Sequence, residues 1–175
     1  RVLFRSAFQA KTQESNFEVT SGTSSQNKYD AKGVELEMGY KSGGFRVNGG
    51  LTYTNATVTG SNDATYVGKT PNRQAKVIYA LSPSYRFDQT TLGLTLIGTT
   101  ASKAAQGNTG TGEVELPAYQ YINAFVNHDL NISTVLSLGI NNMTNVIGYT
   151  EAEASRSAAR SINGRTALAS LRYNF

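Results

Sequence analysis

Cysteine and tryptophan are absent from the sequence, and histidine occurs only once, as His128. Without cysteine, the chain can form neither a disulfide framework nor a thiolate site. A single histidine also argues against a catalytic triad and against a histidine-rich metal site. We therefore expect no enzymatic activity and no bound metal or other cofactor.

Charged residues are scarce as well, at 16% of the chain. Such a low fraction argues against intrinsic disorder, which requires high charge and few aromatic residues. The net charge of +4 is not gathered into a dense lysine and arginine cluster. No aromatic RNA-binding motif is visible either, so we expect no nucleic-acid partner.

Long apolar runs are missing, and no segment reaches the roughly 18 apolar residues of a membrane-spanning helix. What recurs instead is a period of two, in which apolar and polar residues alternate as in a two-faced β-strand. This alternation predicts an all-β fold of about eight antiparallel strands. It is clear in residues 33–40, 45–54, 76–87, 91–96, 136–141 and 166–175, and more mixed in 7–14 and 117–128.

The two faces of these strands differ in character. One face is aliphatic in mid-strand and aromatic near the strand ends, and in residues 33–40 it consists of Val34, Leu36, Met38 and Tyr40. That placement is typical of strands that cross a membrane, where the sheet must close into a barrel. The opposite face predicts a wet or salt-bridged interior, because it carries Glu35, Glu37, Arg46, Lys76 and Arg86. His128 is expected at the membrane interface or in this interior.

The connections between strands alternate in length. Residues 41–44, 88–90 and 129–133 form short turns, whereas 15–30, 57–72, 103–116 and 143–164 are long and rich in Ser, Thr, Asn and Gly. A transmembrane barrel gives this rhythm, because its short turns lie on the periplasmic side and its long loops outside. A soluble sandwich with Greek-key crossovers has no reason for such segregation.

Two local features interrupt this pattern. Pro83 cannot donate a ladder hydrogen bond, so we expect a bulge or the end of a strand there. Residues 150–161 are rich in helix formers but have no apolar stripe to bury, so we interpret them as a loop that can hold a short helical turn.

Three stretches resemble the C-terminal part of TonB-dependent receptors, the active transporters of the bacterial outer membrane. YDAKGVELEMGY at 29–40, followed by FRVNGGLTYTNATV at 45–58, resembles a pair of late strands in that family. LPAYQYINAFVNHDL at 116–130 and LSLGINNMTNVIGY at 136–149 resemble its Leu-Pro-x-Tyr strand and its Asn-Asn-Leu-Phe-Asn-type motif, with Thr144 where Phe is usual. GRTALASLRYNF at 164–175 resembles the closing strand.

The resemblance implies a barrel of about 22 strands around an N-terminal plug. Residues 7–175 would supply about eight of these strands as a C-terminal segment without the plug. The resemblance also implies an outer-membrane location and active import of a scarce, bulky nutrient of the ferric siderophore or oligosaccharide class. TonB would act through the missing plug, and outer-membrane lipid, lipopolysaccharide and the small-molecule substrate would be further partners.

The abrupt end of the chain fits this family as well. Counting back in steps of two from the last residue gives an apolar face of Phe175, Tyr173, Leu171, Ala169 and Ala167. A last strand of this kind resembles the signal that the barrel-assembly machinery reads. Tyr173 and Phe175 would form that signal.

Substrate binding is expected in the long loops, because rigid scaffolds commonly carry function there. Their positive and aromatic side chains could grip an anionic iron chelate or a sugar. Equally, they could be plain loop surface or bind lipopolysaccharide phosphates. The candidate residues are Tyr66, Lys69, Arg73, Tyr149, Glu151, Arg156 and Arg160.

Two alternatives and one boundary stay open. The chain also has the size of a complete small eight-stranded outer-membrane barrel with a structural or adhesive role. A soluble β-protein or an outer-membrane enzyme is the third hypothesis. Residues 1–6, RVLFRS, resemble translated sequencing-adapter DNA, so a cloning or assembly scar is weighed evenly against a native first strand.

A segment of a larger barrel would have open edges, so we predict that it is insoluble or misfolded alone.

Overall fold

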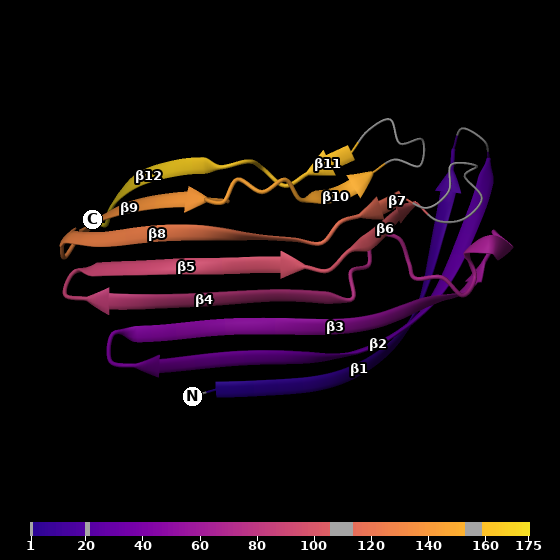
Figure 1. Cartoon of the computed structure of the whole chain (residues 1–175), viewed down its shortest axis with the longest axis horizontal. Coiled ribbons are helices and arrows are strands. Elements are labelled where there is room, and N and C mark those ends of the chain that lie inside the picture. The colour runs from indigo at the N-terminus through magenta and orange to yellow at the C-terminus, as the bar shows by residue number, and fades with distance from the viewer. Residues whose placement is uncertain (1, 20–21, 106–113, 153–158) are drawn as a thin grey trace.

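The computed structural model describes residues 2–19, 22–105, 114–152 and 159–175, which form twelve strands and one short 3₁₀ helix. Eight strands form one antiparallel sheet in the order β1-β2-β3-β4-β5-β8-β9-β12 (Figure 1). The predicted all-β, up-and-down antiparallel fold is therefore confirmed. The eight strands are β1 (Val2–Glu18), β2 (Thr23–Ser42), β3 (Phe45–Ser61), β4 (Val77–Phe87), β5 (Thr90–Thr99), β8 (Tyr119–Asn131), β9 (Thr134–Asn141) and β12 (Thr166–Tyr173).

Two small hairpins and the helix lie in the long connections. β6 (Ser102–Ala105) pairs with β7 (Val114–Leu116), and β10 (Tyr149–Ala152) pairs with β11 (Ala159–Ser161). The helix η1 (Ala64–Tyr66) follows β3. Figure 1 shows these elements at one end of the sheet and the tight turns after β2, β4 and β8 at the other, as predicted, although the β1–β2 connection, which lies with the long ones, is itself short.

Some segments predicted as loop are in fact strand. β1 and β2 pair from Val2↔Gly39 to Glu18↔Thr23, so most of 15–30 is a hairpin. Both faces of this hairpin are polar, and the alternation therefore disappears although the backbone ladder continues. β3 likewise runs on to Ser61, into the predicted loop 57–72. Within 150–161, the described residues form strand in β10 and β11, so the expected helical turn is not found there.

Pro83 lies inside β4, and the expectation of a bulge or a strand end there is wrong. It faces Val47 of β3, and the register to β5 is the same before and after it, at Leu81↔Leu96 and Ser84↔Gly93. A missing N–H removes one ladder hydrogen bond at most. The pairs on both sides therefore keep the strand in register.

One face of the principal sheet, which we call the apolar face, is a continuous apolar surface. Directly opposed residues on neighbouring strands point to the same side, and the register aligns Leu36 with Leu51 and Val126 with Leu138. A protein in water rarely exposes a contiguous apolar patch larger than a few hundred Å², so this face requires a covering. Its members Val34, Leu36, Leu51, Leu81, Leu92, Leu94 and Leu138 keep 38–50% of their surfaces exposed.

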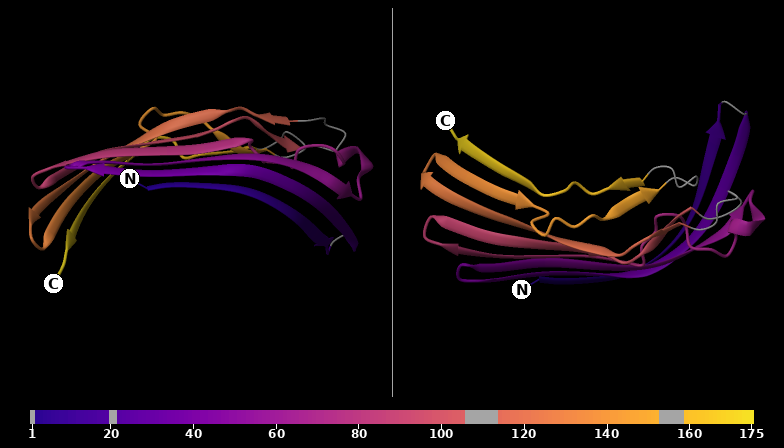
Figure 2. Two further views of the ribbon diagram at one scale, coloured as in Figure 1. Left: turned by 90° about the horizontal axis from the view of Figure 1, so that it is seen from below. Right: turned by 45° about the horizontal axis from the view of Figure 1, so that its top comes forward.

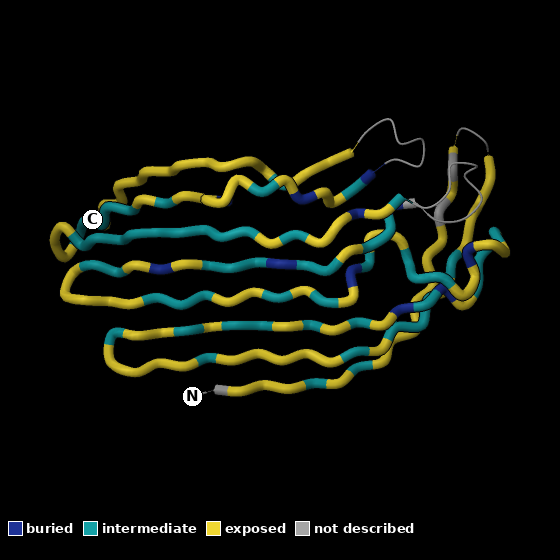
Figure 3. The backbone as a smooth tube through the Cα atoms, in the orientation of Figure 1, coloured by how far each residue is buried: buried dark blue, intermediate teal, exposed yellow. Residues whose placement is uncertain are grey.

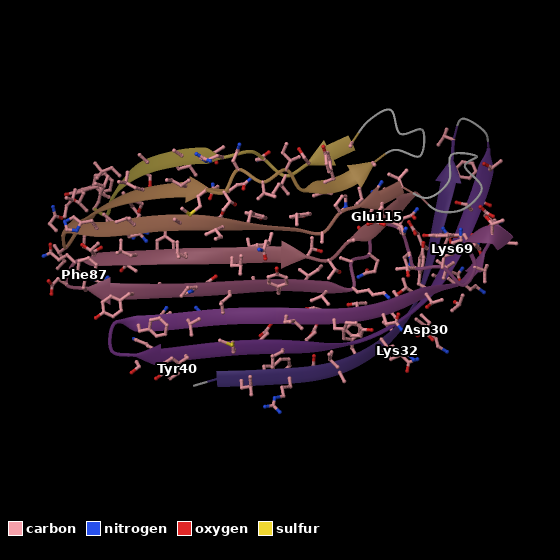
Figure 4. All side chains as sticks on the ribbon, viewed as in Figure 1. Asp30, Lys32, Tyr40, Lys69, Phe87 and Glu115 are labelled. Atoms are coloured by element: carbon pink, nitrogen blue, oxygen red, sulfur yellow. The ribbon has the colours of Figure 1, made fainter. Side chains whose placement is uncertain are left out.

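Aromatic residues mark the ends of the apolar face. Tyr40 and Phe45 lie beside the first tight turn with ring centroids 6.4 Å apart, and Figure 4 labels Tyr40 and Phe87 at this end of the sheet. In β3 the apolar face ends at Tyr53, nine residues along from Phe45 counting both. That length lies within the about 9–11 residues that a tilted membrane strand needs.

The opposite side of the sheet, the polar face, carries the predicted charged residues Glu35, Glu37, Arg46 and Arg86, whereas Lys76 lies just before β4. The register puts Glu35 opposite Thr52 and Lys41 opposite Arg46. Arg5 departs from the pattern, because it pairs with Leu36 and so lies on the apolar face. It belongs to the segment 1–6, whose origin as scar or native strand stays a prediction.

Neither face of the sheet packs on a protein core. The buried apolar residues of the described chain gather near the long connections, and most of the length of the principal strands is exposed or half-buried (Figure 3). Figure 2 shows the sheet as a curved wall whose two edges, β1 and β12, stay apart. The described part of the chain holds no helix with the length and hydropathy needed to span a bilayer.

Candidate substrate-binding rim

The segment after β3 folds back onto that strand. The backbone N–H of Val58 donates to the carbonyl of Lys69 at 2.9 Å. Tyr66 is buried, with 8% of its surface exposed, and its hydroxyl accepts from the backbone N–H of Asn72 at 2.9 Å. These contacts order the loop and lead the chain to Arg73.

Arg73 connects three separate segments. Its backbone has a φ of 61°, and its N–H donates to the carbonyl of Lys103 in β6 at 2.6 Å. Its guanidinium donates from Nη2 to Oε1 of Glu151 in β10 at 2.5 Å. Arg160 of β11 places Nη1 3.7 Å from Oε2 of the same carboxylate. We call Arg73, Glu151 and Arg160 the rim cluster.

The β10–β11 hairpin, which carries Glu151 and Arg160, packs against the β6–β7 hairpin, which accepts the backbone hydrogen bond of Arg73. Ala104, Leu116 and Ala152 form a small buried apolar cluster, with Val114 packed against it. Across the β6–β7 hairpin, Lys103 Nζ lies 3.7 Å from an oxygen of Glu115. The connections β5–β8 and β9–β12 therefore form one structural unit.

The rim cluster combines two guanidinium groups with one carboxylate, so it keeps a net positive charge. The side chains of Arg73, Glu151 and Arg160 retain 54%, 31% and 82% of their accessible surfaces. Ion pairs this exposed contribute only about 0–1 kcal/mol to stability. Guanidinium forks match carboxylates and phosphates in geometry, so the cluster can bind an anion.

The other predicted site residues are placed separately. Tyr66 and Lys69 belong to the loop on β3, and Tyr149, at the start of β10, is 42% exposed. Arg156 lies outside the described residues. The structure thus brings together Arg73, Glu151 and Arg160, while a role in substrate binding stays a prediction for all seven residues.

Sequence reasoning missed the structural role of Asn142. Its side chain is buried, with 2% exposed, and its amide donates to the carbonyls of Val146 and Asn163, both at 2.9 Å. Asn145 accepts from the backbone N–H of Arg165 at 3.1 Å. Both asparagines have left-handed backbones, with φ of 47° and 53°. The motif NNMTN therefore fixes the path from β9 to β12.

The sequence also does not predict the ion pair between Lys103 and Glu115, for a different reason. Both lie in a segment predicted as loop, 103–116, where the structure forms the β6–β7 hairpin. Each strand of this hairpin is too short for its alternation to stand out from the surrounding polar residues.

The C-terminal aromatics are exposed at an edge of the sheet. Tyr173 and Phe175 meet edge to face, with ring centroids 5.0 Å apart, and are 57% and 113% exposed. β12 pairs only with β9. The role of these two rings as an assembly signal stays a prediction.

The sequence matches the family model of TonB-dependent receptor-like β-barrels over residues 5–143. The chain belongs to the TonB-dependent receptor family. Among solved structures, it resembles the siderophore receptor PiuA of Acinetobacter baumannii, with 20% identity and a TM-score of 0.74 over 98% of this chain and 26% of that one. No curated protein matches the sequence.

Two further solved structures share the fold of this TonB-dependent receptor chain. The ferric-catecholate import receptor Fiu of E. coli K12 is 18% identical, with a TM-score of 0.77 over 99% of this chain and 25% of that one. The copper transporter OprC is 14% identical, with a TM-score of 0.76 over 99% and 28%. The chain thus spans about a quarter of the length of the receptors that it matches.

TonB-dependent receptors are transporters of the bacterial outer membrane. The apolar face is accordingly the lipid-facing side of a barrel wall, and the polar face lines the interior. His128 lies on the lipid-facing side beside a tight turn, where its Nδ1 and Thr90 Oγ1 are hydrogen-bonded at 2.9 Å. This position is one of the two expected for it, the membrane interface.

Proposed function

We propose that the chain is the C-terminal wall segment of a receptor of about 22 strands around an N-terminal plug. The receptor imports an anionic metal chelate of the ferric siderophore class across the outer membrane. The observation that carries this proposal is the rim cluster, in which segments far apart in the sequence place two guanidinium groups around one carboxylate.

A net positive rim favours an anionic chelate over a neutral oligosaccharide, which would require stacking and neutral hydrogen-bonding groups. The named cargoes of the matched structures support the same choice. PiuA is a siderophore receptor and Fiu imports ferric catecholate, whereas OprC, which transports copper, supports only a metal cargo. Lys69 and Tyr149 are proposed as additional contacts on neighbouring segments.

Several partners follow from this proposal. TonB supplies energy through the plug that an upstream part of the receptor provides. The barrel-assembly machinery reads Tyr173 and Phe175, whose rings are exposed at the sheet edge. Outer-membrane lipid and lipopolysaccharide surround the apolar face.

The alternative of a complete small barrel would require β1 to pair with β12. In the part of the chain that the structure describes, these strands are the two edges of an open sheet. A functional signal peptide directly before residue 7, with no encoded plug, would support the alternative.

The test is uptake of ferric catecholate by cells that lack their own siderophore receptors and express the full-length receptor. The variant Arg73→Gln with Arg160→Gln should bind the chelate at least roughly tenfold more weakly, because each charge-assisted hydrogen bond contributes about 1.5–3 kcal/mol. The matched control is Arg46→Gln with Arg172→Gln, which removes two charges near the tight turns.

Uptake should also disappear in cells without TonB, while binding to the cell surface should persist. Equal binding by the rim variant and its control would contradict an anionic cargo. Import that continues without TonB would contradict active transport by this family mechanism.

A further inference from the structure

The lipid-facing side of the β1–β2 hairpin changes from apolar to polar between two neighbouring rows of residues. Ala7, Val34 and Tyr53 oppose one another on β1, β2 and β3, and they form the last apolar row. In the next row toward the hairpin tip, Lys32 pairs with Gln9 and Asn55. The hydrocarbon boundary therefore lies between these two rows.

Three lysines lie on the outward side just beyond this boundary. Lys32 is in the first polar row, Lys11 pairs with Asp30 in the second, and Lys28 follows two residues farther along β2. All three are exposed. Figure 4 shows Lys32 and Asp30 where the hairpin bends away from the rest of the sheet.

These lysines have no ion-pair partner among the residues that the structure describes. The carboxylate between them, Asp30, accepts instead from the side-chain amide of Gln9 at 3.3 Å. A cavity of about 400 Å³ is lined by Lys11, Lys28, Asp30 and Thr59. Two ammonium groups and a hydroxyl provide donors that suit a phosphate, and the two positive charges outweigh the single carboxylate in the lining, that of Asp30.

The depth of the lysines identifies the source of such a phosphate. Two residues along a strand advance about 6.6 Å, so a strand tilted near 45° rises about 5 Å per row. The three lysines therefore stand about 5–15 Å above the hydrocarbon, and flexible lysine stems extend this reach. This is the layer that lipid headgroups occupy, on the side of the long loops.

We propose that Lys11, Lys28 and Lys32 bind the phosphorylated headgroup of an outer-leaflet lipid. The lipid's acyl chains continue down the apolar face, and its phosphate accepts from the ammonium groups. The site rests on the outer-membrane placement of the chain and is independent of the cargo of the receptor.

The test uses the full-length receptor, purified from outer membranes, stripped of lipid in detergent and examined by native mass spectrometry. Three probes are added separately: lipid A with two phosphates, the same lipid A with its phosphates removed, and inorganic phosphate. The variant Lys28→Gln with Lys32→Gln should retain the phosphorylated lipid roughly thirtyfold less, because each lysine near a charged headgroup contributes about fivefold.

Two further variants make the result specific. Lys41→Gln with Arg46→Gln removes two charges from the polar face and should bind like the wild type, and Lys28→Arg with Lys32→Arg should retain binding. Heat-modifiable gel migration confirms that each variant is folded.

Equal retention by the double glutamine variant and the wild type would overturn the proposal. Equal retention of dephosphorylated lipid A would show that the acyl chains alone bind. Saturation of the lysines by inorganic phosphate, with no preference for the lipid, would show a free-anion site instead. None of these outcomes depends on transport, so failure of the proposed cargo would leave the lipid site testable.

Discussion

Apart from Tyr66 with its hydroxyl, Asn142 is the only residue with a polar side chain that is buried among the described residues. Its amide makes three hydrogen bonds of 2.9 Å, two with Val146 and one with Asn163. Leaving a buried polar group without a partner costs about 1–3 kcal/mol, which exceeds the net contribution of a typical hydrogen bond. One amide therefore determines how the chain leaves β9 and approaches the last strand.

Replacing this residue should destabilise the folded barrel. Asn142→Ala leaves a backbone N–H and two carbonyls without their partner, and we expect a loss of about 2–4 kcal/mol in the free energy of unfolding. The neighbouring exposed Asn141 makes only a 3.5 Å contact with Thr166, so Asn141→Ala is the matched control, expected within about 0.5 kcal/mol. Denaturant unfolding of the full-length receptor measures both, and similar losses would contradict the role given to Asn142.

The pKa of Tyr29 should report on whether the β1–β2 hairpin is folded. Tyr29 lies beyond the apolar rows and donates its hydroxyl to Glu14 Oε2 at 2.8 Å. Burial, and then the hydrogen bond and charge of Glu14, raise the pKa of Tyr29 to about 12. Because folding raises this pKa, its contribution to stability is complete below about pH 10 and is lost as the pH rises toward 12.

Tyrosinate absorbance provides the measurement. The difference between wild type and Tyr29→Phe should show one group that titrates above the ordinary tyrosine range. Glu14→Gln should lower the pKa of Tyr29 only in part, because burial is its largest cause. An ordinary pKa for Tyr29 in the folded receptor would contradict the hydrogen-bonded hairpin.

The sequence indicates which charged and aromatic residues lie in the long connections, but not which of them meet in the fold. Loop composition pointed to Arg73, Glu151 and Arg160 as candidates, because binding residues are disproportionately found on loops that a rigid scaffold positions, and their role in binding stays a prediction. The pairing itself joins residues 78 positions apart in the sequence. No local pattern specifies which charges meet across such a distance, since the fold of three connections decides it.

At the scale of strands, aromatic rings cover glycines on their neighbours. Phe125 of β8 faces Gly93 on β5 and Gly139 on β9. A Cβ placed on Gly93 would collide with the Phe125 ring, whereas on Gly139 its nearest neighbour is the carbonyl oxygen of Ala124 at 3.8 Å. The ring therefore lies over β5, and the absence of a side chain at Gly93 is what admits it.

This asymmetry predicts different effects for the same substitution on the two sides of Phe125. Gly93→Ala should destabilise the barrel by about 1–3 kcal/mol, because the ring must leave its position. Gly139→Ala should be neutral or slightly stabilising, since it reduces the freedom of the unfolded chain. Thermal loss of heat-modifiable gel migration compares the two, and equal effects would contradict the ring's placement.

The two faces of β5 provide a further prediction. Leu94→Lys introduces a charge on the lipid-facing side near mid-strand, where lysine costs about 2–4 kcal/mol at the bilayer midplane. Thr95→Lys places the same side chain on the polar face and should be tolerated. The measurement is the yield of folded receptor in the outer membrane. A normal yield of the Leu94 variant would show that this face is not in contact with lipid.

Strands were predictable where one face meets hydrocarbon, because the environment there selects apolar residues at every second position. Val34, Leu36 and Met38 gave a clear signal for that reason. The signal ends at Lys32, where both sides of the hairpin meet water, and the ladder of β1 and β2 continues through most of residues 15–30, for which the sequence predicts a loop. Pro83 was misjudged for the opposite reason, because its neighbours on both sides hold the register without its hydrogen bond.

At the scale of the whole molecule, the sheet is open. β1 and β12 each pair with one neighbour in the described structure, and every residue of β12 is exposed. Unpaired edges beside a large apolar face are a template for association. In the proposed receptor, further strands would continue the wall from both edges.

We therefore expect residues 1–175 to aggregate or misfold when they are expressed alone. Refolding into detergent micelles should give no heat-modifiable monomer, whereas the full-length receptor should give one. Light scattering and gel migration make the comparison. A monodisperse, heat-modifiable monomer of this chain would mean that β1 closes against β12 and would support the small-barrel alternative.

The bonds of Arg73 have a consequence for engineering. Its backbone N–H donates to Lys103, and its guanidinium donates to Glu151, so this one residue connects three stretches of the outer loops. Lengthening or shortening any one stretch would displace the other two. A chimera designed to exchange cargo preference between relatives would accordingly have to transplant all three stretches together. If only one stretch were grafted, its contacts would not match those of the other two.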